Sequence, residues 1–234
     1  MDLFKRDTHE EDESHWLSVS DLMSGLMIVF LFIAIALMRH AFVERDKIKQ
    51  VAVAYQENQV AIYEQLKREF EPDLSKWNAD IDEDTLTFTF KSPDVLFKEG
   101  ETTLNEQYKV LLQDFFPRYM EVLKSYRDSI NEIRIEGHTS SKWNSNTSER
   151  DAYFNNMQLS QGRTQAVLSY IFDLETSSTY RDWIKLNFAA VGLSSSKLIR
   201  DEAGTEDPTK SRRVSFRVIT NADIQIKRIL ETVE

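Results

Sequence analysis

The sequence predicts an α+β protein with a single N-terminal transmembrane helix, a helical stalk, and a mixed sheet covered by helices on one face. Three observations support this prediction. An uncharged apolar run extends from Leu22 to Met38, a segment without Gly or Pro follows from Arg39 to Phe70, and strand and helix patterns alternate beyond it. Such alternation is typical of a sheet that buries one face under helices.

Composition limits the possible classes of protein. With 234 residues of which 29% are charged, the chain is too polar for a polytopic membrane protein but long enough for one anchor and one domain. The net charge of −10 argues against binding to nucleic acid, for which a basic stripe is expected. The chain has no cysteine, which excludes disulfides and thiolate metal sites.

Residues 16–38 are predicted to be the transmembrane helix. As a helix this segment reaches about 34 Å, enough to cross a hydrocarbon core of about 30 Å. It follows an acidic leader and lacks a small-residue cleavage site, so we expect an anchor and not a removable signal peptide. Residues 1–15 are mostly charged and are predicted to be an acidic tail, disordered or bound to a partner.

Asp21 is the one charged residue inside the predicted span. An ionised carboxylate at the centre of such a helix costs about 2.5–3.5 kcal/mol, so we expect shielding by protein or neutralisation by a proton. Ser18 and Ser24 lie three residues to either side, on the same helix face. Asp21 is interpreted as an interfacial residue, a static interhelical contact, or a site that binds and releases an ion.

Residues 39–80 are predicted to form a helical stalk and linker, in which Pro72 ends the helix. Polar and apolar residues at an approximate 3-4 spacing form a seam that could pair with a second copy, although it spans fewer than four clean heptads. The seam consists of Ile48, Val51, Tyr55, Asn58, Ile62 and Leu66.

Residues 81–234 are predicted to form the globular domain. Alternating apolar residues predict four strands. We place them at 85–91, 130–136, 186–191 and 213–220. Helices are expected at 104–126, broken or capped near Pro117, at 160–173, and at 223–230.

Three motifs in this domain carry a resemblance to a known family. They are G-H-T at 137–139, L-S-x-x-R at 159–163 and R-R-V at 212–214. Together with their flanking segments they resemble the peptidoglycan-binding domain of the OmpA and MotB families, over roughly residues 84–220. The resemblance implies an OmpA-like β/α/β/α/β sandwich whose groove holds a stem peptide of the cell wall.

The resemblance also implies which residues bind the wall. Asn156 and Arg163 match the family's binding Asn and Arg, with Thr139, Leu159 and Arg213 in the adjoining shell. A guanidinium suits a stem-peptide carboxylate because it donates two parallel, charge-assisted hydrogen bonds. The alternative for Arg163 is a surface residue paired with a local carboxylate.

One position departs from the family pattern. Ser140 stands where the family has an Asp that complements the ammonium of the diamino acid. Glu149 or Asp151, in the longer loop that follows, is expected to supply the missing charge. The alternative is a cleft that takes a variant ligand or binds weakly.

The membrane end resembles a narrower group. The sequence V-S-D-L-M-S-G-L at 19–26, on a single helix before this domain, resembles MotB-type stator subunits of ion-driven motors. Flagellar members have a basic tail and a Y-A-D-F-M-type motif. The tail here is acidic, and the D-L-M-S-x-L version followed by I-V-F-L-F-I resembles the MotB-like subunit of the Zorya anti-phage defence system.

This resemblance implies a homodimeric axle inside a pentameric ring of a ZorA- or MotA-like polytopic partner, with protons or sodium ions passing by way of Asp21. It places the chain in the bacterial inner membrane, with its N-terminus in the cytoplasm and its domain in the periplasm. Counting Lys and Arg residues gives the opposite orientation. Lys5 and Arg6 precede the span, whereas four basic residues follow it closely: Arg39, Arg45, Lys47 and Lys49.

Other functions remain open at this level. A flagellar stator subunit and a passive tether between membrane and wall both fit the same sequence. We expect no enzyme, cofactor or metal site, because the four histidines are scattered and no cysteine nucleophile exists.

Overall fold

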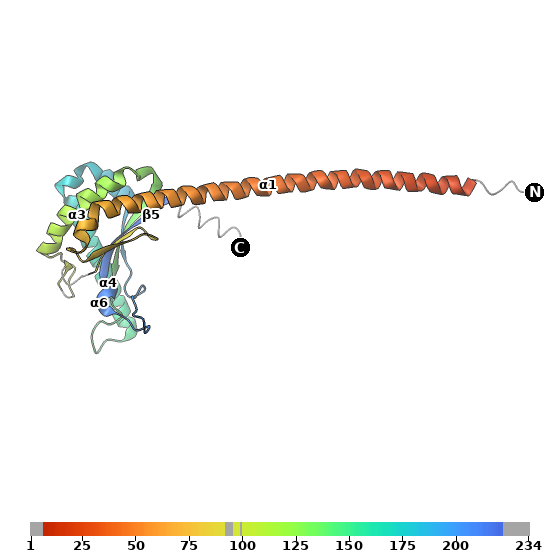
Figure 1. Cartoon of the computed structure of the whole chain (residues 1–234). Helices are drawn as coiled ribbons and strands as arrows, with labels where there is room; N and C mark the ends of the chain where they lie inside the picture. The colour runs from red at the N-terminus through yellow and green to blue at the C-terminus, as the bar shows by residue number, and fades with distance from the viewer. Residues whose placement is uncertain (1–6, 92–95, 99, 222–234) are drawn as a thin grey trace, which may run out of the picture. The chain divides into compact units, whose positions relative to one another are not determined.

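The computed structural model describes residues 7–91, 96–98 and 100–221, with side chains described from Val19 onward except at 51, 52 and 54–56. The chain divides into two compact units between Val51 and Ala52. Helix α1 (Asp7–Leu74) contributes to both units (Figure 1).

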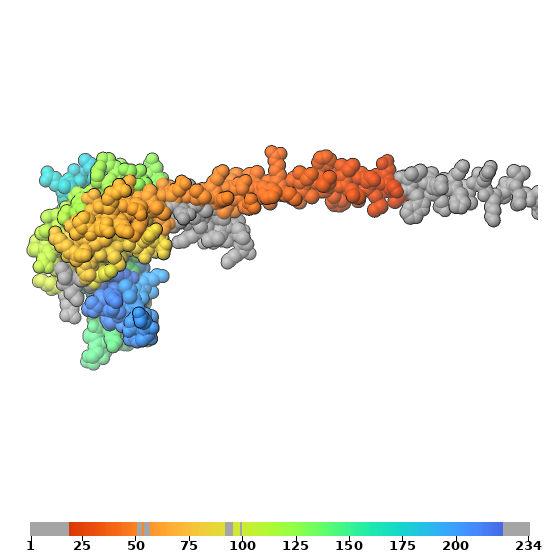
Figure 2. Space-filling model, in the orientation of Figure 1, coloured from red at the N-terminus to blue at the C-terminus, as the bar shows by residue number. Residues whose placement is uncertain are grey.

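The N-terminal unit contains one stretch of α1 that is long and apolar enough to cross a membrane, Val19–Gln50. Leu, Ile, Val, Phe and Met dominate it, and their described side chains are exposed in the single chain (Figure 2). Because such a surface is poorly solvated by water, this part of α1 requires lipid or neighbouring helices around it.

A five-stranded mixed sheet forms the centre of the C-terminal unit. Its strands are β1 (Ala79–Asp82), β2 (Thr87–Phe90), β3 (Ile130–His138), β4 (Phe188–Gly192) and β5 (Arg213–Thr220). Their order across the sheet is β1-β2-β5-β3-β4, and only β3 and β4 pair in parallel. The four predicted strands are confirmed, with ends shifted by two residues or fewer.

Helices and short turns complete the unit. They are α3 (Glu106–Lys124), η1 (Arg127–Ser129), α4 (Glu149–Asp173), η2 (Glu175–Tyr180), α5 (Arg181–Asn187) and α6 (Pro208–Ser211). Asn105 and Ser148 cap α3 and α4, each accepting a hydrogen bond from the backbone N–H three residues later. These bonds satisfy N–H groups that the helix itself leaves unpaired.

Alternation along the strands gives the sheet two different faces. One face carries buried apolar side chains, including Phe88, Phe216 and Ile133. The ring of Phe115 from α3 packs on it, 4.7 Å from that of Phe88 and 5.1 Å from that of Phe216. The other face, which we call the polar face, carries charged and hydroxyl side chains. The prediction of helices on one face is confirmed.

The last turns of α1 belong to this apolar core. Ile62, Leu66 and Phe70 recur every four residues and are fully buried, and the ring of Phe70 lies 5.3 Å from that of Phe88. The predicted pairing seam is therefore wrong at Ile62 and Leu66, because both side chains face the domain core. A helix that pairs with a second copy and a helix that packs on a domain core show the same amphipathic spacing. Only the surface that the two side chains contact distinguishes these arrangements.

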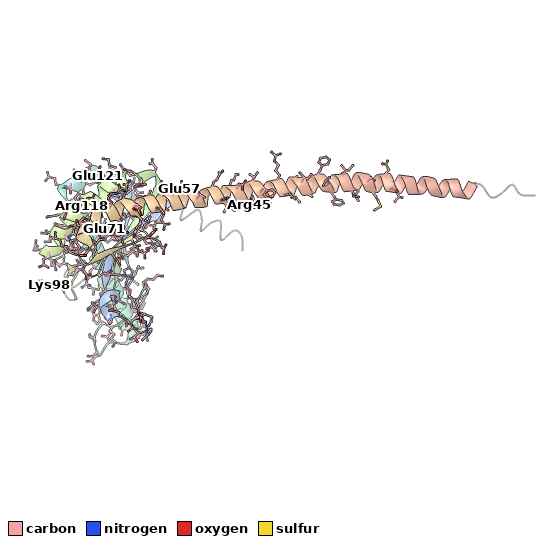
Figure 3. The ribbon with its side chains drawn as sticks, viewed as in Figure 1. Arg45, Glu57, Glu71, Lys98, Arg118 and Glu121 are labelled. Atoms are coloured by element: carbon pink, nitrogen blue, oxygen red, sulfur yellow. The ribbon has the colours of Figure 1, made fainter. Side chains whose placement is uncertain are left out.

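Arg118 of α3 fastens α1 to the domain (Figure 3). Its Nε donates to Glu69 Oε1 at 2.7 Å and its Nη1 to Asp73 Oδ2 at 2.9 Å. The guanidinium also lies over the rings of Phe70 and Trp77. Burial would lower its pKa, but hydrogen bonds to the carboxylates outweigh that effect and raise the pKa. This cation links the two helices as one unit.

Two predicted helices differ in the structure, and one strand was not predicted. Helix α3 continues through Pro117 without a break, because the side chains on both sides of the proline are buried and their packing outweighs the lost hydrogen bond. Helix α4 starts at Glu149 and not at Ser160, and β1 was not predicted, since Asp80 and Asp82 are poor strand formers. The helix expected at 223–230 lies outside the described residues.

The docking of α1 predicts that Leu66→Ala destabilises the globular domain. Deleting a fully buried leucine side chain should lower the free energy of unfolding by about 2–5 kcal/mol, measured by thermal melting of the full chain in detergent. Leu186→Ala, at an 83% exposed leucine of α5, is the matched control and should change little. Equal melting of the two variants would contradict the placement of Leu66 in the core.

Candidate functional site

A cleft lies at the N-terminal half of α4, beside the loop that follows β3. Its cavity measures about 220 Å³. It is lined by Gly100, Thr139, Ser140, Lys142, Trp143, Asn156, Leu159, Arg163 and Arg212. We call it the α4 cleft. It brings together four of the six predicted wall-binding residues: Thr139, Asn156, Leu159 and Arg163.

Arg163 is buried, with 8% of its surface exposed. Its Nε donates to the carbonyl of Glu101 at 2.9 Å, its Nη2 donates to that of Lys98 at 3.2 Å, and its guanidinium lies 4.8 Å from the ring centre of Phe97. The interpretation of Arg163 as a surface residue is therefore wrong. The side chain fixes the backbone before α3 and places positive charge at the wall of the cleft.

Asn156 shapes the opposite wall. Its Nδ2 donates to the carbonyls of Ser140 at 3.1 Å and Lys142 at 3.4 Å, and its side chain is almost fully buried. The backbone N–H of Thr139 donates to the carbonyl of Ser194 at 2.9 Å. The two Asn156 bonds hold the loop after β3 against α4, and the Thr139 bond joins this loop to the one after β4. Together they set the shape of the cleft.

Gly137 explains how β3 can approach α4 so closely. A Cβ at this position would lie 2.8 Å from the carbonyl oxygen of Ser160 and 2.9 Å from Cγ2 of Thr164. Only glycine fits such a contact without displacing the helix backbone. The G-H-T motif therefore sets the distance between the sheet and the helix that carries Asn156 and Arg163.

The cleft is cationic. Its described lining includes Lys142, Arg163 and Arg212 but no Asp or Glu. Asp151 lies exposed in the first turn of α4, where the hydroxyl of Ser148 donates to its Oδ2 at 2.7 Å, and it does not line the cleft. Such a surface suits a carboxylate or another anion.

A carboxylate that the sequence did not indicate binds the loop after β3. Glu206 accepts hydrogen bonds from the backbone N–H of Ser141, at 2.9 Å, and from the Ser141 hydroxyl. Both contacts anchor the loop. Glu149 is exposed, like Asp151, and neither replaces the family carboxylate at position 140 within the cleft.

Arg213 does not join the cleft, whereas its neighbour Arg212 does. On β5, residue 213 shares the polar face with residues 215 and 217, and Arg213 lines the cavity on that face. Residue 212 has the parity of Val214, which is buried on the apolar side. Because side chains alternate along a strand, this parity could have identified Arg212 from the sequence. No comparable pattern in the sequence indicated that Lys142 and Trp143 would line the cleft.

His138 and Glu136 form a buried pair on the polar face. The Nε2 of His138 lies 3.6 Å from Oε2 of Glu136. Burial lowers the pKa of the His138 imidazole, and the opposite effect of Glu136 offsets this only in part. Burial would raise the pKa of Glu136, but the contact with His138 and the nearby arginines outweigh this and lower it. The imidazole is therefore neutral at pH 7.

The predicted ion-carrying residues lie on α1, in the N-terminal unit. The Asp21 side chain is exposed in the single chain, and the hydroxyl of Ser24 donates to the carbonyl of Ser20 at 2.8 Å. Residue 18 is helical, with its side chain outside the described set. Asp21 and Ser24 share one helix face, three residues apart.

Comparisons with known proteins give the following similarities. Residues 96–212 match the OmpA family. The chain is 54% identical over 222 residues to the Zorya protein ZorB of Escherichia coli, covering 95% of this chain and 94% of that protein.

Similar solved structures include two bacterial proteins. A MotB-like protein from Desulfovibrio vulgaris aligns with a TM-score of 0.49 and 19% identity, over 73% of this chain and 94% of that one. The cell wall anchor of the T6SS from Pseudomonas aeruginosa aligns with a TM-score of 0.46 and 21% identity, over 67% of this chain and 97% of that one.

The buried imidazole predicts a loss of stability in acid. An unfolded histidine titrates near pH 6.5, whereas the pKa of buried His138 is lower, so the unfolded state takes up more protons as the pH falls below neutrality. The melting temperature should therefore fall between pH 7.5 and 5.5, and less so in His138→Gln. His40→Gln, at an exposed histidine, should melt like the parent at every pH. An unchanged pH dependence in His138→Gln would contradict the assignment.

Proposed function

Because the chain belongs to the ZorB family and its C-terminal domain to the OmpA family, we propose that it is the wall-anchored subunit of a proton-driven membrane motor in anti-phage defence. In this proposal residues 1–15 form a cytoplasmic tail, 16–38 cross the inner membrane, and 39–80 form the stalk and linker, whose last helical turns pack in the domain core. Residues 81–234 bind peptidoglycan in the periplasm.

One observation carries the proposal. Helix α1 bears Asp21 in its apolar stretch and continues as one helix to Phe70, which is buried in the core of the OmpA-like domain. A passive tether needs an apolar helix but no carboxylate within it. An ionised carboxylate in an apolar membrane-spanning segment costs free energy, so an acidic residue at such a position indicates a functional site.

The ion-carrying step follows from the chemistry of Asp21. The carboxylate takes up a proton from one side of the membrane, becomes neutral, and releases the proton to the other side. Neutral and ionised forms prefer different surroundings, so each cycle changes which contacts with a surrounding ring are favourable. The membrane potential supplies about 2.3 kcal/mol per charge per 100 mV.

The proposed assembly places two copies of the chain inside a pentameric ring of a ZorA- or MotA-like polytopic partner. In a homodimer, two Asp21 side chains face the ring and can alternate between protonation states. Ser18 and Ser24 keep the same helix face small and polar, which allows close approach by a neighbouring helix. The exposed apolar side chains of α1 supply the surface for that ring.

The α4 cleft is proposed to hold a stem peptide of peptidoglycan through its carboxylates. Lys142, Arg163 and Arg212 line the cleft and match negatively charged groups. Asn156 and Arg163 position its walls by their backbone contacts. With no carboxylate among the described lining residues, this cleft favours the acidic end of the peptide over its ammonium group.

Asp21→Asn tests the motor. The amide keeps the size of the side chain and much of its hydrogen bonding but cannot release a proton, so protection against phage should be lost while the protein still inserts and accumulates. Protection is measured by plaque formation on cells carrying the complete system.

Asp46→Asn, at an exposed carboxylate of α1 beyond the proposed span, is the matched control and should retain protection. If cells with Asp21→Asn were fully protected, the motor hypothesis would be excluded and only the passive tether would remain.

Lys142→Gln tests the cleft. Its ammonium makes no hydrogen bond or ion pair with any residue that the structure describes, so its removal should leave melting unchanged. Binding of the full chain to isolated peptidoglycan sacculi should weaken by about tenfold, the typical effect of losing one charged hydrogen bond. The measurement is cosedimentation. Lys76→Gln, at an exposed lysine outside the cleft, should bind like the parent, and equal binding by all three proteins would argue against the α4 cleft as the wall site.

A further inference from the structure

The polar face of the sheet forms a second, larger cavity, separate from the α4 cleft. It measures about 630 Å³ and is lined by side chains of β1, β2, β3 and β5 and of the loops beside them. Its lining holds six basic and three acidic residues. The basic residues are Lys91, Arg134, Lys197, Lys210, Arg213 and Arg217. The acidic residues are Asp80, Asp82 and Glu136. This surface is basic although the whole chain carries a net charge of −10.

Two arginines lie directly opposite each other at the centre of this face. The register of β3 and β5 pairs Arg134 with Arg217, and Thr87 of β2 lies on the other side of Arg217. Like charges at directly opposed positions destabilise a sheet. Arg134 is partly compensated, because its Nη2 donates to Glu132 Oε2 at 3.0 Å.

Among the described residues, Arg217 has no hydrogen-bonded carboxylate of this kind and interacts with Glu136 of β3 only through its charge. Within the part of the chain that the structure describes, its guanidinium makes no hydrogen bond and no ion pair, and the Nε atoms of both Arg134 and Arg217 are buried without a hydrogen-bond partner. A buried donor without a partner costs free energy, more so for a charged group. The native sheet therefore carries a cost that an anion would relieve.

The carboxylates on this face balance only part of its positive charge. Asp80 pairs with Lys91 at 2.7 Å, Asp82 accepts from the hydroxyl of Thr85 at 2.7 Å, and Glu136 lies beside His138. Three carboxylates face six basic side chains, so positive charge remains on this face. A ligand for this site must be anionic.

We propose that Arg134 and Arg217 form an anion site that binds a phosphate group, either free phosphate or the phosphodiester of a lipid headgroup. Two neighbouring guanidinium groups present more N–H donors than the two oxygens of one carboxylate can accept, whereas a phosphate offers additional oxygens and up to two charges. The hydroxyls of Thr87 and Ser215 line the same cavity and can donate to the remaining oxygens.

The site makes two linked predictions for Arg217→Gln. In phosphate-free buffer the variant should be as stable as the parent or slightly more so, because the substitution removes like-charge repulsion and breaks no hydrogen bond. Its affinity for the anion should fall by about tenfold or more, as expected for the loss of a charged donor.

The experiment is thermal melting of the full chain in uncharged detergent, at constant ionic strength, with inorganic phosphate or glycerophosphoglycerol as the probe. A ligand that binds only the folded state raises the melting temperature with concentration. Arg68→Gln, at an exposed arginine of α1 outside the cavity, is the matched control. It corrects for the general stabilisation of proteins by phosphate.

The parent and Arg68→Gln should be stabilised by a probe, and Arg217→Gln and Arg134→Gln should respond much less. A stronger response to inorganic phosphate identifies free phosphate as the ligand, and a stronger response to the phosphodiester identifies the lipid headgroup. Equal responses by all four proteins, no response to either probe, or a marked loss of stability of Arg217→Gln in phosphate-free buffer would overturn the proposal.

Discussion

The structure depends on the burial of the last turns of α1 in the core of the OmpA-like domain. Leu66 and Phe70 contribute apolar surface to that core, and Arg118 joins α1 to α3 through Glu69 and Asp73. Removing these turns would expose the apolar surfaces of α3 and β2. The helix that carries the long apolar stretch is thus also a structural element of the OmpA-like domain.

The two faces of the sheet explain where the functional groups lie. Apolar side chains on one face recruit α1, α3 and α4, and this packing positions the α4 cleft at the edge of the covered side. Polar side chains on the other face line a basic cavity. Strand parity separates Arg212 from Arg213, so two adjacent arginines of one motif serve different surfaces. The β5 backbone therefore connects the proposed wall site to the proposed phosphate site.

The α4 cleft combines positioning and charge in the same side chains. Asn156 and Arg163 donate hydrogen bonds to backbone carbonyls of the loops that form the cleft walls. Arg163 also contributes its positive charge to the lining. Replacement of the family Asp by Ser140 leaves this lining without a described carboxylate. The described lining therefore combines three basic side chains with no acidic one.

The sequence by itself determined the long apolar stretch that contains Asp21, the four main strands, the helices on one face of the sheet, and the motifs that gather Thr139, Asn156, Leu159 and Arg163. Each is encoded locally, by periodicity or by a short motif. Tertiary structure alone decided that Ile62 and Leu66 face a domain core and not a second helix, because both partners demand the same spacing. It also decided that Asp151 lies outside the cleft, that Glu206 anchors the loop, and that Arg134 meets Arg217, since these pairings join residues far apart in the chain.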